Sequence, residues 1–407
     1  MKTVVIGGGA AGMICAYYCA KNGESTVLLE QNEKLGKKIY ITGKGRCNVT
    51  NDCDEEEFLA NIVTNARFMR GAIWSYPPSS TMEFLQENGL KIKTERGNRV
   101  FPLSDKSSDV IKCFERSMQK VGVQVHLNCK VYNLLVNDGK IEGVKCSLGE
   151  ISCDKVVVCT GGKSYSSTGS TGDGYAFAKS VGHTVTPIRS ALCGLELLGT
   201  DFASLAGLTL KNIGFKVFKE QKEIYRDFGE LLFTHTGVSG PVVISASSYI
   251  SKEGNGNYTV SIDLKPALDE KTLDSRLLRD FAQFKGKVLK NSLFELLPKS
   301  LIPEVIRHSG ISGEAKVSEF SAENRKKLLT SLKDLRYKMA KLRPLEECIV
   351  TGGGVNVKEI NPSTMESKII KGLYFAGEVV DVDALTGGFN LQCAFAMGYL
   401  AGNATQK

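Results

Sequence analysis

The stretch Val4-Val5-Ile6-Gly7-Gly8-Gly9-Ala10-Ala11-Gly12 decides the fold of this chain. Its apolar, β-branched start predicts a buried strand, and the segment that follows matches G-x-G-x-x-G. Apolar residues at helical spacing predict a helix from Ala11 to Asn22, and Thr26 to Leu29 predicts the next strand. Glu30 ends that strand. The order strand, glycine turn, helix, strand and acid predicts a dinucleotide-binding unit.

Each residue of the glycine turn has a separate expected role. Gly7 permits the tight turn, Gly9 lets the backbone approach a pyrophosphate, and Gly12 lets helix and strand pack closely. Ala11 lies where the helix begins, and the free N–H groups and dipole at that end favour an anion. Glu30 is placed to accept hydrogen bonds from ribose hydroxyls. The alternative is a glycine-rich turn that binds nothing.

Composition excludes several classes of protein. The 407 residues are 42% hydrophobic and 24% charged, which is typical of a globular protein of two or three domains. The net charge of +8 comes from cations scattered among acids, so we expect a solvated surface and no nucleic-acid partner. An anionic substrate is a second interpretation of this charge. No stretch reaches membrane-span length, so we expect a cytoplasmic protein without membrane insertion.

The twelve cysteines form no C-x-x-C pair and accompany no histidine cluster. We therefore expect no metal site and a reducing compartment, in which the thiols behave as small buried hydrophobes. Cys47 and Cys53 could suggest a redox dithiol, but five residues separate them and no helix is expected there.

A glycine-rich basic loop, Gln31 to Asn51, follows Glu30 directly. Backbone donors and positive charge both favour a phosphate-bearing cofactor, although a flexible basic loop without ligand is the alternative. Farther along, Lys130 to Val136, Ile141 to Ser147 and Glu150 to Cys159 predict a β-meander that returns the chain to a parallel sheet. These segments supply further cofactor-binding candidates: Gln31, Lys38, Gly43, Arg46, Cys47, Asn48, Val131, Thr160 and Gly161.

The sequence predicts a discontinuous α/β domain, residues 1–187 and 345–407, interrupted by an inserted substrate domain at 188–344. Within the insertion we expect an antiparallel β-barrel (188–265 and 333–344) and a helical subdomain (266–332). The expected strands are Ile213 to Phe218, Tyr258 to Leu264 and Leu335 to Leu342, and the expected helices are Leu273 to Phe284, Leu289 to Leu297 and Ala322 to Leu332.

The chain then returns to the first domain. Ile369 to Phe375 predicts a strand that runs into Gly377-Glu378-Val379-Val380-Asp381, and Gly387-Gly388-Phe389-Asn390-Leu391-Gln392 opens a final helix. Together with Gly7 to Glu30 and Cys159 to Gly161, this segment resembles the FAD-binding fold of two-dinucleotide-binding flavoproteins. The resemblance implies that Glu378 or Asp381 binds the ribityl or pyrophosphate region and that the last helix points at the isoalloxazine.

The chain more closely resembles a bacterial family of NAD(P)/FAD-dependent oxidoreductases, some labelled aminoacetone-oxidase-like, which includes a clostridial 3-dehydro-bile acid delta(4,6)-reductase. Four stretches carry the resemblance: Gly43 to Asn48, Thr168 to Gly174, Phe233 to Pro241 and Gly387 to Gln392. It implies a Rossmann-like FAD-binding domain with a β-meander and an inserted barrel plus helices. The cofactor-binding positions implied near the end of the chain are Gly377, Glu378, Asp381, Asn390, Leu391 and Gln392.

The sequence is compatible with three functions. No second G-x-G-x-x-G follows a strand, so NAD(P)H is expected to bind transiently beside FAD. In the first reading, NAD(P)H drives reduction of a conjugated enone such as a 3-oxo bile acid or steroid. In the second, FAD oxidises a small amine and dioxygen reoxidises it. The third is a flavin-binding sensor without turnover.

The expected catalytic acids are Tyr165, after Gly161-Gly162, and His235, in the Thr-His-Thr-Gly loop. A phenol or an imidazole can donate a proton to an enolate oxygen. The alternative for His235 is a side chain that braces its turn. We expect the inserted domain to roof the flavin, with both loops meeting near its N5.

Overall fold

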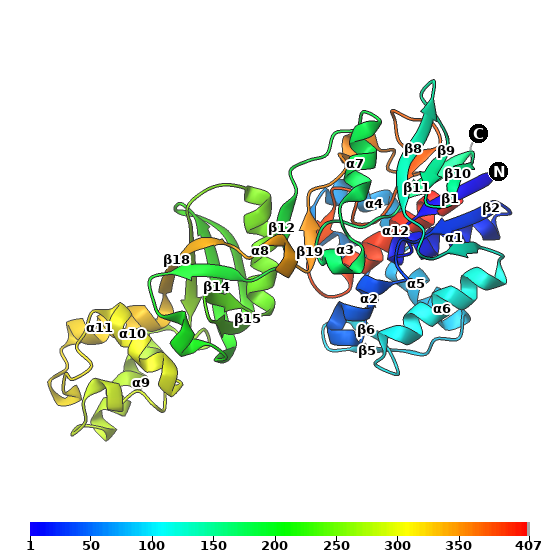
Figure 1. The fold of residues 1–407 in the computed structure, drawn as a ribbon. Coiled ribbons are helices and arrows are strands. Elements are labelled where there is room, and N and C mark those ends of the chain that lie inside the picture. Colours follow the sequence, from blue (N-terminus) through cyan, green and yellow to red (C-terminus); the bar gives the residue numbers. More distant parts are fainter. Residues whose placement is uncertain (405–407) are drawn as a thin grey trace. The chain divides into compact units, whose positions relative to one another are not determined.

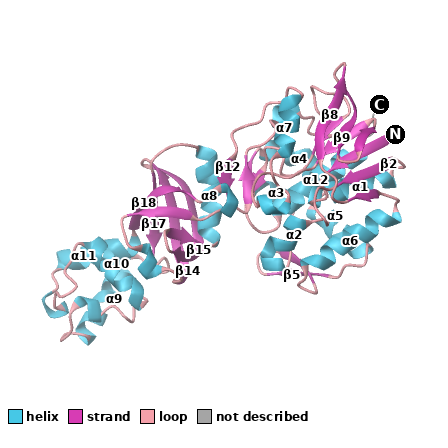
Figure 2. Cartoon of the chain, viewed as in Figure 1, coloured by secondary structure: helices cyan, strands magenta, loops and turns pink. Residues whose placement is uncertain are grey.

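The computed structural model describes residues 1–404, and the chain divides into two compact units (Figure 1). The first, the sheet unit, is Met1–Ala191 with Pro344–Lys407. The second, the barrel unit, is Leu192–Arg343. Figure 2 shows strands and helices in both units.

A parallel sheet of order β20-β11-β1-β2-β7 forms the centre of the sheet unit. Its buried strands are apolar on both faces, as parallel strands covered by helices must be. The strands are β1 (Lys2–Ile6), β2 (Ser25–Leu29), β7 (Gln124–His126), β11 (Lys155–Val158) and β20 (Leu373–Phe375). The predicted βαβ unit at the N-terminus is confirmed.

Two helices distant in sequence pack closely in this unit: α1 (Ala10–Lys21) and α12 (Phe389–Asn403). Gly398 makes the approach possible, because a Cβ there would lie 2.4 Å from the backbone oxygen of Ala11. Figure 1 shows them as blue and red ribbons. The first and last segments of the chain therefore form one structural layer.

The remaining elements of the sheet unit surround this core. They are α2 (Lys37–Ile41), β3 (Thr50–Asn51), α3 (Glu55–Ala60), β4 (Ile62–Thr64), α4 (Ala66–Ser75), α5 (Pro78–Glu87), β5 (Ile92–Glu95), β6 (Arg99–Pro102), α6 (Ser107–Lys120), β8 (Val131–Asn137), β9 (Lys140–Cys146), β10 (Gly149–Ser152), α7 (Asp173–Ser180), β12 (Arg189–Ala191), β19 (Val350–Gly352) and β21 (Asp383–Ala384).

The β-meander is present as β8, β9 and β10. The single strand predicted from Glu150 to Cys159 is wrong, because this segment contributes β10 to the meander and then β11 to the parallel sheet. Cys153 and Asp154 separate the two strands. The sequence pattern does not reveal that the chain passes from one sheet to another here, because the residues of β10 and of β11 are both typical of a strand.

A closed barrel of order β13-β16-β15-β14-β17-β18 forms the barrel unit. This confirms the predicted antiparallel barrel with helices. Its elements are β13 (Leu195–Leu198), β14 (Thr209–Lys219), β15 (Lys222–Thr234), β16 (Gly237–Ser239), α8 (Pro241–Glu253), β17 (Tyr258–Asp263), α9 (Glu270–Gln283), α10 (Ile302–Ser309), α11 (Ala322–Lys333) and β18 (Leu335–Leu342).

The helix predicted from Leu289 to Leu297 is wrong. Only a 3₁₀ turn, Leu289–Asn291, forms there. Leu289, Leu293 and Leu297 are buried at helical spacing, which produced the prediction. Instead, the Ser292 hydroxyl bonds the Leu289 carbonyl, and Pro298 disfavours helical backbone in the residue before it.

Glu304 on α10 binds the helical part of the barrel unit to the barrel. Its buried carboxylate accepts hydrogen bonds from Thr200 (2.6 Å), Arg307 (2.6 Å) and Tyr337 of β18 (2.9 Å). Burial by itself raises the pKa of the Glu304 carboxyl, but hydrogen bonds from its neighbours outweigh burial and hold the pKa well below its ordinary value.

The depressed pKa of Glu304 predicts that the barrel unit loses stability in acid. Because its pKa is depressed in the folded state, its stabilisation is present above the unfolded pKa of about 4.3 and is lost as the pH falls below it. Glu304→Ala should cost about 3 kcal/mol or more at pH 7, since it leaves buried partners unpaired. Urea unfolding at pH 7 and at about pH 2.5 measures this cost, and the difference between parent and variant should be smaller at the lower pH. A variant with a free energy of unfolding equal to the parent at both would contradict the prediction.

Candidate functional site

In the glycine turn between β1 and α1, a side chain has room at Gly9 and at none of the other three glycines. A Cβ at Gly7, where φ is +104°, would lie 2.5 Å from the Cys159 oxygen, and a Cβ at Gly12 would lie 1.8 Å from the Gly7 oxygen. A Cβ at Gly9 meets no described atom within 4 Å. No side chain caps the first turn of α1, which contains Ala11. The N–H groups of the first turn of α1 and the space beside Gly9 are therefore available to an anion.

Glu30 lies at the end of β2, beside this turn. Its buried carboxylate accepts hydrogen bonds from the Gly8 N–H (2.7 Å) and the Asn32 N–H (2.8 Å). The Asn32 side chain adds a third bond of 2.6 Å. The carboxylate thus braces the turn from inside, and its position at the strand end matches the ribose acceptor of a dinucleotide-binding unit.

We predict that Glu30→Ala weakens FAD binding by about 1.5 to 3 kcal/mol, the scale of hydrogen bonds to a charged group. Titration of the apoprotein with FAD, followed by flavin fluorescence, measures the change. Glu33→Ala is the matched control, since Glu33 lies in the same loop but is exposed and paired with Lys37. Equal FAD affinity in the two variants would assign the ribose contact to another residue.

A compact polar cluster joins Lys38, Ser164 and Glu378. Lys38 Nζ lies 2.8 Å from Glu378 Oε2 and 2.6 Å from Ser164 Oγ. Glu378 Oε1 also accepts a 2.8 Å bond from the Thr351 N–H. Burial alone raises the pKa of the Glu378 carboxyl, but the Lys38 ammonium and these hydrogen bonds reverse the direction and lower it. Lys38 and Glu378, predicted separately from distant motifs, form one ion pair.

The Arg46 side chain contacts two carboxylates. Its guanidinium lies 2.5 Å from Glu95 and 2.5 Å from Asp105, and its Cζ lies 4.2 Å from the centre of the Phe101 ring. These contacts hold the β5–β6 hairpin against the Gly43–Asn48 loop. Within that loop Cys47 is buried and has φ of +61°, a left-handed conformation that is unusual outside glycine.

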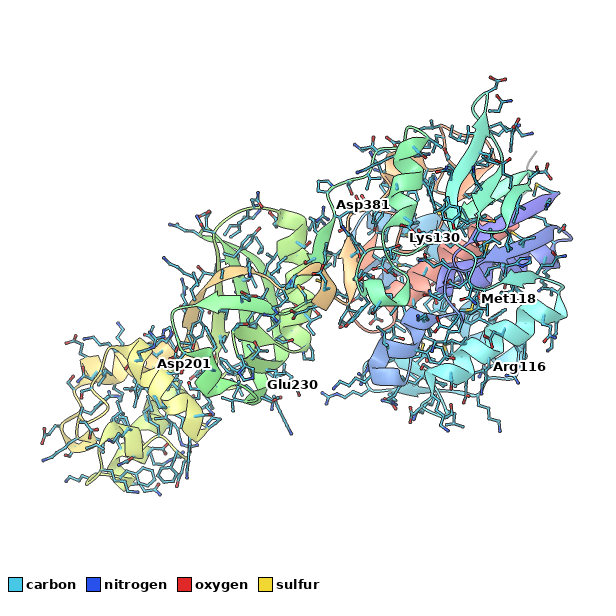
Figure 3. All side chains as sticks on the ribbon, in the orientation of Figure 1. Arg116, Met118, Lys130, Asp201, Glu230 and Asp381 are labelled. Atoms are coloured by element: carbon cyan, nitrogen blue, oxygen red, sulfur yellow. The ribbon has the colours of Figure 1, made fainter. Side chains whose placement is uncertain are left out.

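Three buried oxygens of the predicted site lack a hydrogen-bond partner among the described residues. They are Asn48 Oδ1, Thr160 Oγ1 and Asp381 Oδ1. Asp381, labelled in Figure 3, lies in the sheet unit after β20, and burial raises the pKa of its carboxyl. Buried polar atoms without partners cost about 1 to 3 kcal/mol each, so a polar ligand that reached them would be stabilised.

The first turn of α12 is braced from within the chain. Asn390 bonds the backbone of Ala384 in both directions, through Oδ1 (3.0 Å) and Nδ2 (2.8 Å). Gln392 is fully buried and accepts hydrogen bonds from Thr50 (2.8 Å) and Thr81 (2.6 Å). These amides therefore fix the helix start. No side chain caps that start, where Gly388 has φ of +99°, so its N–H groups remain open to an anion.

The other cofactor candidates also lie in the sheet unit. Gln31 donates a 2.8 Å hydrogen bond to the Gly169 carbonyl, which links the Glu30 strand end to the loop after β11. Val131 is buried at the start of β8, and Leu391 is half-buried in α12. Left-handed backbone occurs at the three remaining glycines, Gly43, Gly161 and Gly377.

Tyr165 and His235 belong to different units. Tyr165 is half-buried, has φ of +54° and directly follows Ser164 of the Lys38 cluster; its ring centre lies 6.0 Å from Lys38 Nζ. His235 is exposed in the two-residue turn between β15 and β16. Their meeting at the flavin stays a prediction.

These residues fit FAD by the chemistry that they offer. An open glycine turn, an acid at the end of β2, two uncapped helix starts and three buried oxygens without partners suit a large polar dinucleotide. Sequence reasoning missed Ser164 and Thr351, which complete the Lys38–Glu378 cluster. The only available signal was the position of Ser164 beside Tyr165 and of Thr351 in the Thr-Gly-Gly-Gly segment.

Among the described residues, no helix is both long and apolar enough to cross a membrane. The same part of the chain contains no group of three or more His, Cys, Asp or Glu side chains placed to hold a metal ion.

Known proteins resemble this chain over its whole length. It is 31% identical to the 3-dehydro-bile acid delta(4,6)-reductase of Clostridium scindens, over 99% of this chain and 98% of that protein. It is 29% identical to the ribosomal RNA dihydrouridine synthase of Escherichia coli, over 97% of this chain and 96% of that protein.

A flavocytochrome c3 fumarate reductase shares the fold, with a TM-score of 0.53 and 18% identity over 99% of this chain and 77% of that one. The predicted flavoprotein-type fold is thereby confirmed, and the 31% identity to the Clostridium scindens protein confirms the predicted family resemblance. The model of the HI0933-like protein Rossmann domain matches residues 1–404. The chain belongs to the HI0933-like family of Rossmann-domain proteins.

Proposed function

We propose that this protein is an NAD(P)H-driven, FAD-dependent oxidoreductase that reduces a carbon–carbon double bond conjugated with a carbonyl, as in a 3-oxo bile acid or another steroid enone. The observation that carries the proposal is the 31% identity, across nearly all of both chains, to a relative named for this type of reduction. Bound FAD supplies hydride chemistry between the nicotinamide and the electron-poor carbon.

The residues that would hold FAD all come from the sheet unit. The start of α1, beside Gly9, offers N–H groups to the pyrophosphate, and Glu30 offers a carboxylate to the ribose. Asn48, Thr160 and Asp381 offer buried acceptors that lack partners in the described chain. The uncapped start of α12 would favour the negative charge of a reduced ring system.

The proton that completes the reduction would come from Tyr165 or His235. Tyr165 is the better positioned of the two, because Lys38 and Glu378 fix the adjacent Ser164 through bonds of 2.6 Å and 3.1 Å. Its positive φ is a strained conformation for a bulky residue, and such strain is found where surrounding structure holds a side chain for function.

Anaerobic spectroscopy tests the proposal. NADH or NADPH should bleach the bound flavin, and a steroid enone such as a 3-oxo bile acid should restore its absorbance while it loses a double bond. Bleaching by a small amine, with rapid recovery only in air, would support an amine oxidase instead. A flavin that responds to no reductant would favour a sensor without turnover.

Uridine in RNA is a second candidate substrate. Dihydrouridine is uridine with its C5=C6 bond reduced, and that bond is conjugated with the C4 carbonyl, so both substrate classes require the same hydride addition. The relative from Escherichia coli named for ribosomal RNA matches this chain at 29% identity over nearly its full length. The charge distribution agrees, since the barrel unit has 24 Lys and Arg against 18 Asp and Glu, or +6 of the total +8.

The same protein with its flavin reduced distinguishes the two candidate substrates. Ribosomal RNA added without air should restore the flavin absorbance, and nucleosides from the digested RNA should include dihydrouridine. Restoration by the steroid enone alone supports the first candidate, and restoration by RNA alone supports the second.

A further inference from the structure

The outer surface of the barrel carries a row of cations that the strand register creates. Arg226 of β15 is directly opposite Lys216 of β14. Lys216 is opposite Ser261 of β17, and Ser261 is opposite Arg336 of β18. Directly opposite residues of antiparallel strands lie on one face, about 5 Å apart between neighbouring strands. Four adjacent strands therefore present three cationic side chains across one line of the barrel.

This row of cations lowers the stability of the folded barrel. Like charges directly opposite across a ladder are destabilising, and Arg226 faces Lys216 in this way. Two carboxylates reduce the cost: Glu223 lies 2.8 Å from Arg226, and Asp334 lies 2.8 Å from Arg336. Arg226 holds the pKa of Glu223 below its ordinary value; burial raises the pKa of Asp334, but Arg336 and Ser261 outweigh it, and Lys216 adds a small lowering to the pKa of both. The lysine thus shares carboxylates that already have partners.

Neighbouring rows extend the surface. Lys338 of β18 is exposed and is opposite Thr259 of β17. Thr259 is in turn opposite Phe218 of β14. We call Lys216, Arg226, Arg336 and Lys338 the barrel basic face. These four cations outnumber Glu223 and Asp334, and Asp263, in the row of Phe228, is paired with Lys333. The side chains of Arg226 and Arg336 are 64% and 55% exposed, so the charges reach solvent.

Two aromatic side chains lie beside these cations. The Arg336 guanidinium is 5.2 Å from the centre of the Phe218 ring. Phe228 is opposite Gly214, one row from Lys216, and is 60% exposed. Cations with aromatic rings beside them suit a ligand with regularly spaced phosphates and flat bases. A small monoanion would not use a surface that spans four strands. Figure 1 shows β14, β15 and β18 in the barrel unit.

We propose that the barrel basic face is a docking surface for the phosphodiester backbone of an RNA substrate. The inference rests on the second candidate of the proposed function, RNA uridine, and adds where the polyanion binds. The lysines and arginines would contact phosphates, and Phe228 would stack on an unpaired base. Phosphate contacts of this kind give sequence-independent affinity that decreases with salt.

The test uses the FAD-loaded full chain and a fluorescein-labelled RNA hairpin with a uridine-rich loop, followed by anisotropy at several salt concentrations. Lys216→Gln with Lys338→Gln should weaken binding at least about tenfold and reduce the slope of log affinity against log salt by about 1.5 to 2, the loss of two phosphate contacts. Lys216→Arg with Lys338→Arg should bind like the parent, because the charges remain.

Lys112→Gln with Lys120→Gln is the matched control. Both lysines are exposed on α6 of the sheet unit, and the change in net charge is the same. This control should retain parental affinity and slope. Equal losses in the two glutamine variants would mean that net charge alone attracts RNA, which overturns the proposal. Parental binding by the barrel variant overturns it as well.

Two further readouts separate this surface from the chemistry. Flavin bleaching by NAD(P)H and turnover of a small enone should be unchanged in the barrel variant. Binding that depends on Lys216 and Lys338 without dihydrouridine formation supports the surface and contradicts the uridine candidate. Binding to vesicles of phosphatidylglycerol, with no binding to the RNA, would assign the face to anionic lipid and overturn the proposal.

Discussion

Gly9→Val should fold like the parent and fail to retain FAD. A Cβ at this position meets no described atom within 4 Å, and Gly9 has φ of −84° and ψ of −167°, a region that valine adopts readily. The branched side chain would instead fill the space beside the α1 N-terminus, where a pyrophosphate must approach the backbone. We expect FAD affinity to decrease at least about 100-fold, or roughly 2.7 kcal/mol.

Flavin titration and thermal unfolding of the apoproteins check this result together. The apo form of Gly9→Val should unfold within a few degrees of apo parent. Gly12→Ala is the informative contrast, since a Cβ there would lie 1.8 Å from the Gly7 oxygen and should prevent correct folding. Full FAD occupancy in Gly9→Val would place the pyrophosphate away from this turn.

Tyr165→Phe should lower turnover of the enone by about 10² or more and leave flavin reduction by NAD(P)H nearly unchanged. The substitution removes only the phenolic hydroxyl, while the ring beside Lys38 and the left-handed backbone remain. A proton donor acts after the flavin has been reduced, so only the second half-reaction should slow. Rapid mixing measures the two half-reactions separately.

His235→Ala is the parallel variant for the other predicted acid. His235 is exposed in a turn, so its removal should leave the barrel unit folded. A loss of turnover in this variant alone would assign the proton to the imidazole. Parental turnover in both variants would assign it to water or another group. A raised KM with preserved kcat would indicate substrate binding instead.

The N-terminal βαβ unit could be predicted from sequence because each of its signals is local. Apolar strands, glycines at fixed spacing and an acid at a strand end specify the structure within one short segment. The barrel was also predictable as a class, since its strands alternate in the ordinary way. Leu289 to Leu297 was mispredicted because buried leucines at helical spacing occur in a packed irregular segment too.

The partners of the polar site residues required the tertiary structure. Lys38 and Glu378 are 340 residues apart, and Gln392 meets Thr50 and Thr81 across more than 300. The sequence marked these residues as important but could not show whether their side chains face a cofactor or one another. The same holds for Arg46, whose partners lie on β5 and just after β6, in a segment that no motif connects to it.

The sequence by itself determined the fold class, the glycine turn and the family, because these depend on local spacing. The tertiary structure decided which charges meet. Cations that are scattered along the sequence, such as Lys216, Arg226 and Arg336, become neighbours only through the register of four strands. Successive side chains of a strand point to opposite faces of the sheet. A shift of the pairing register by one residue would therefore place each of these cations on the other face. Register is fixed by packing of the whole barrel, which is why composition suggested a solvated surface and the structure shows an ordered row.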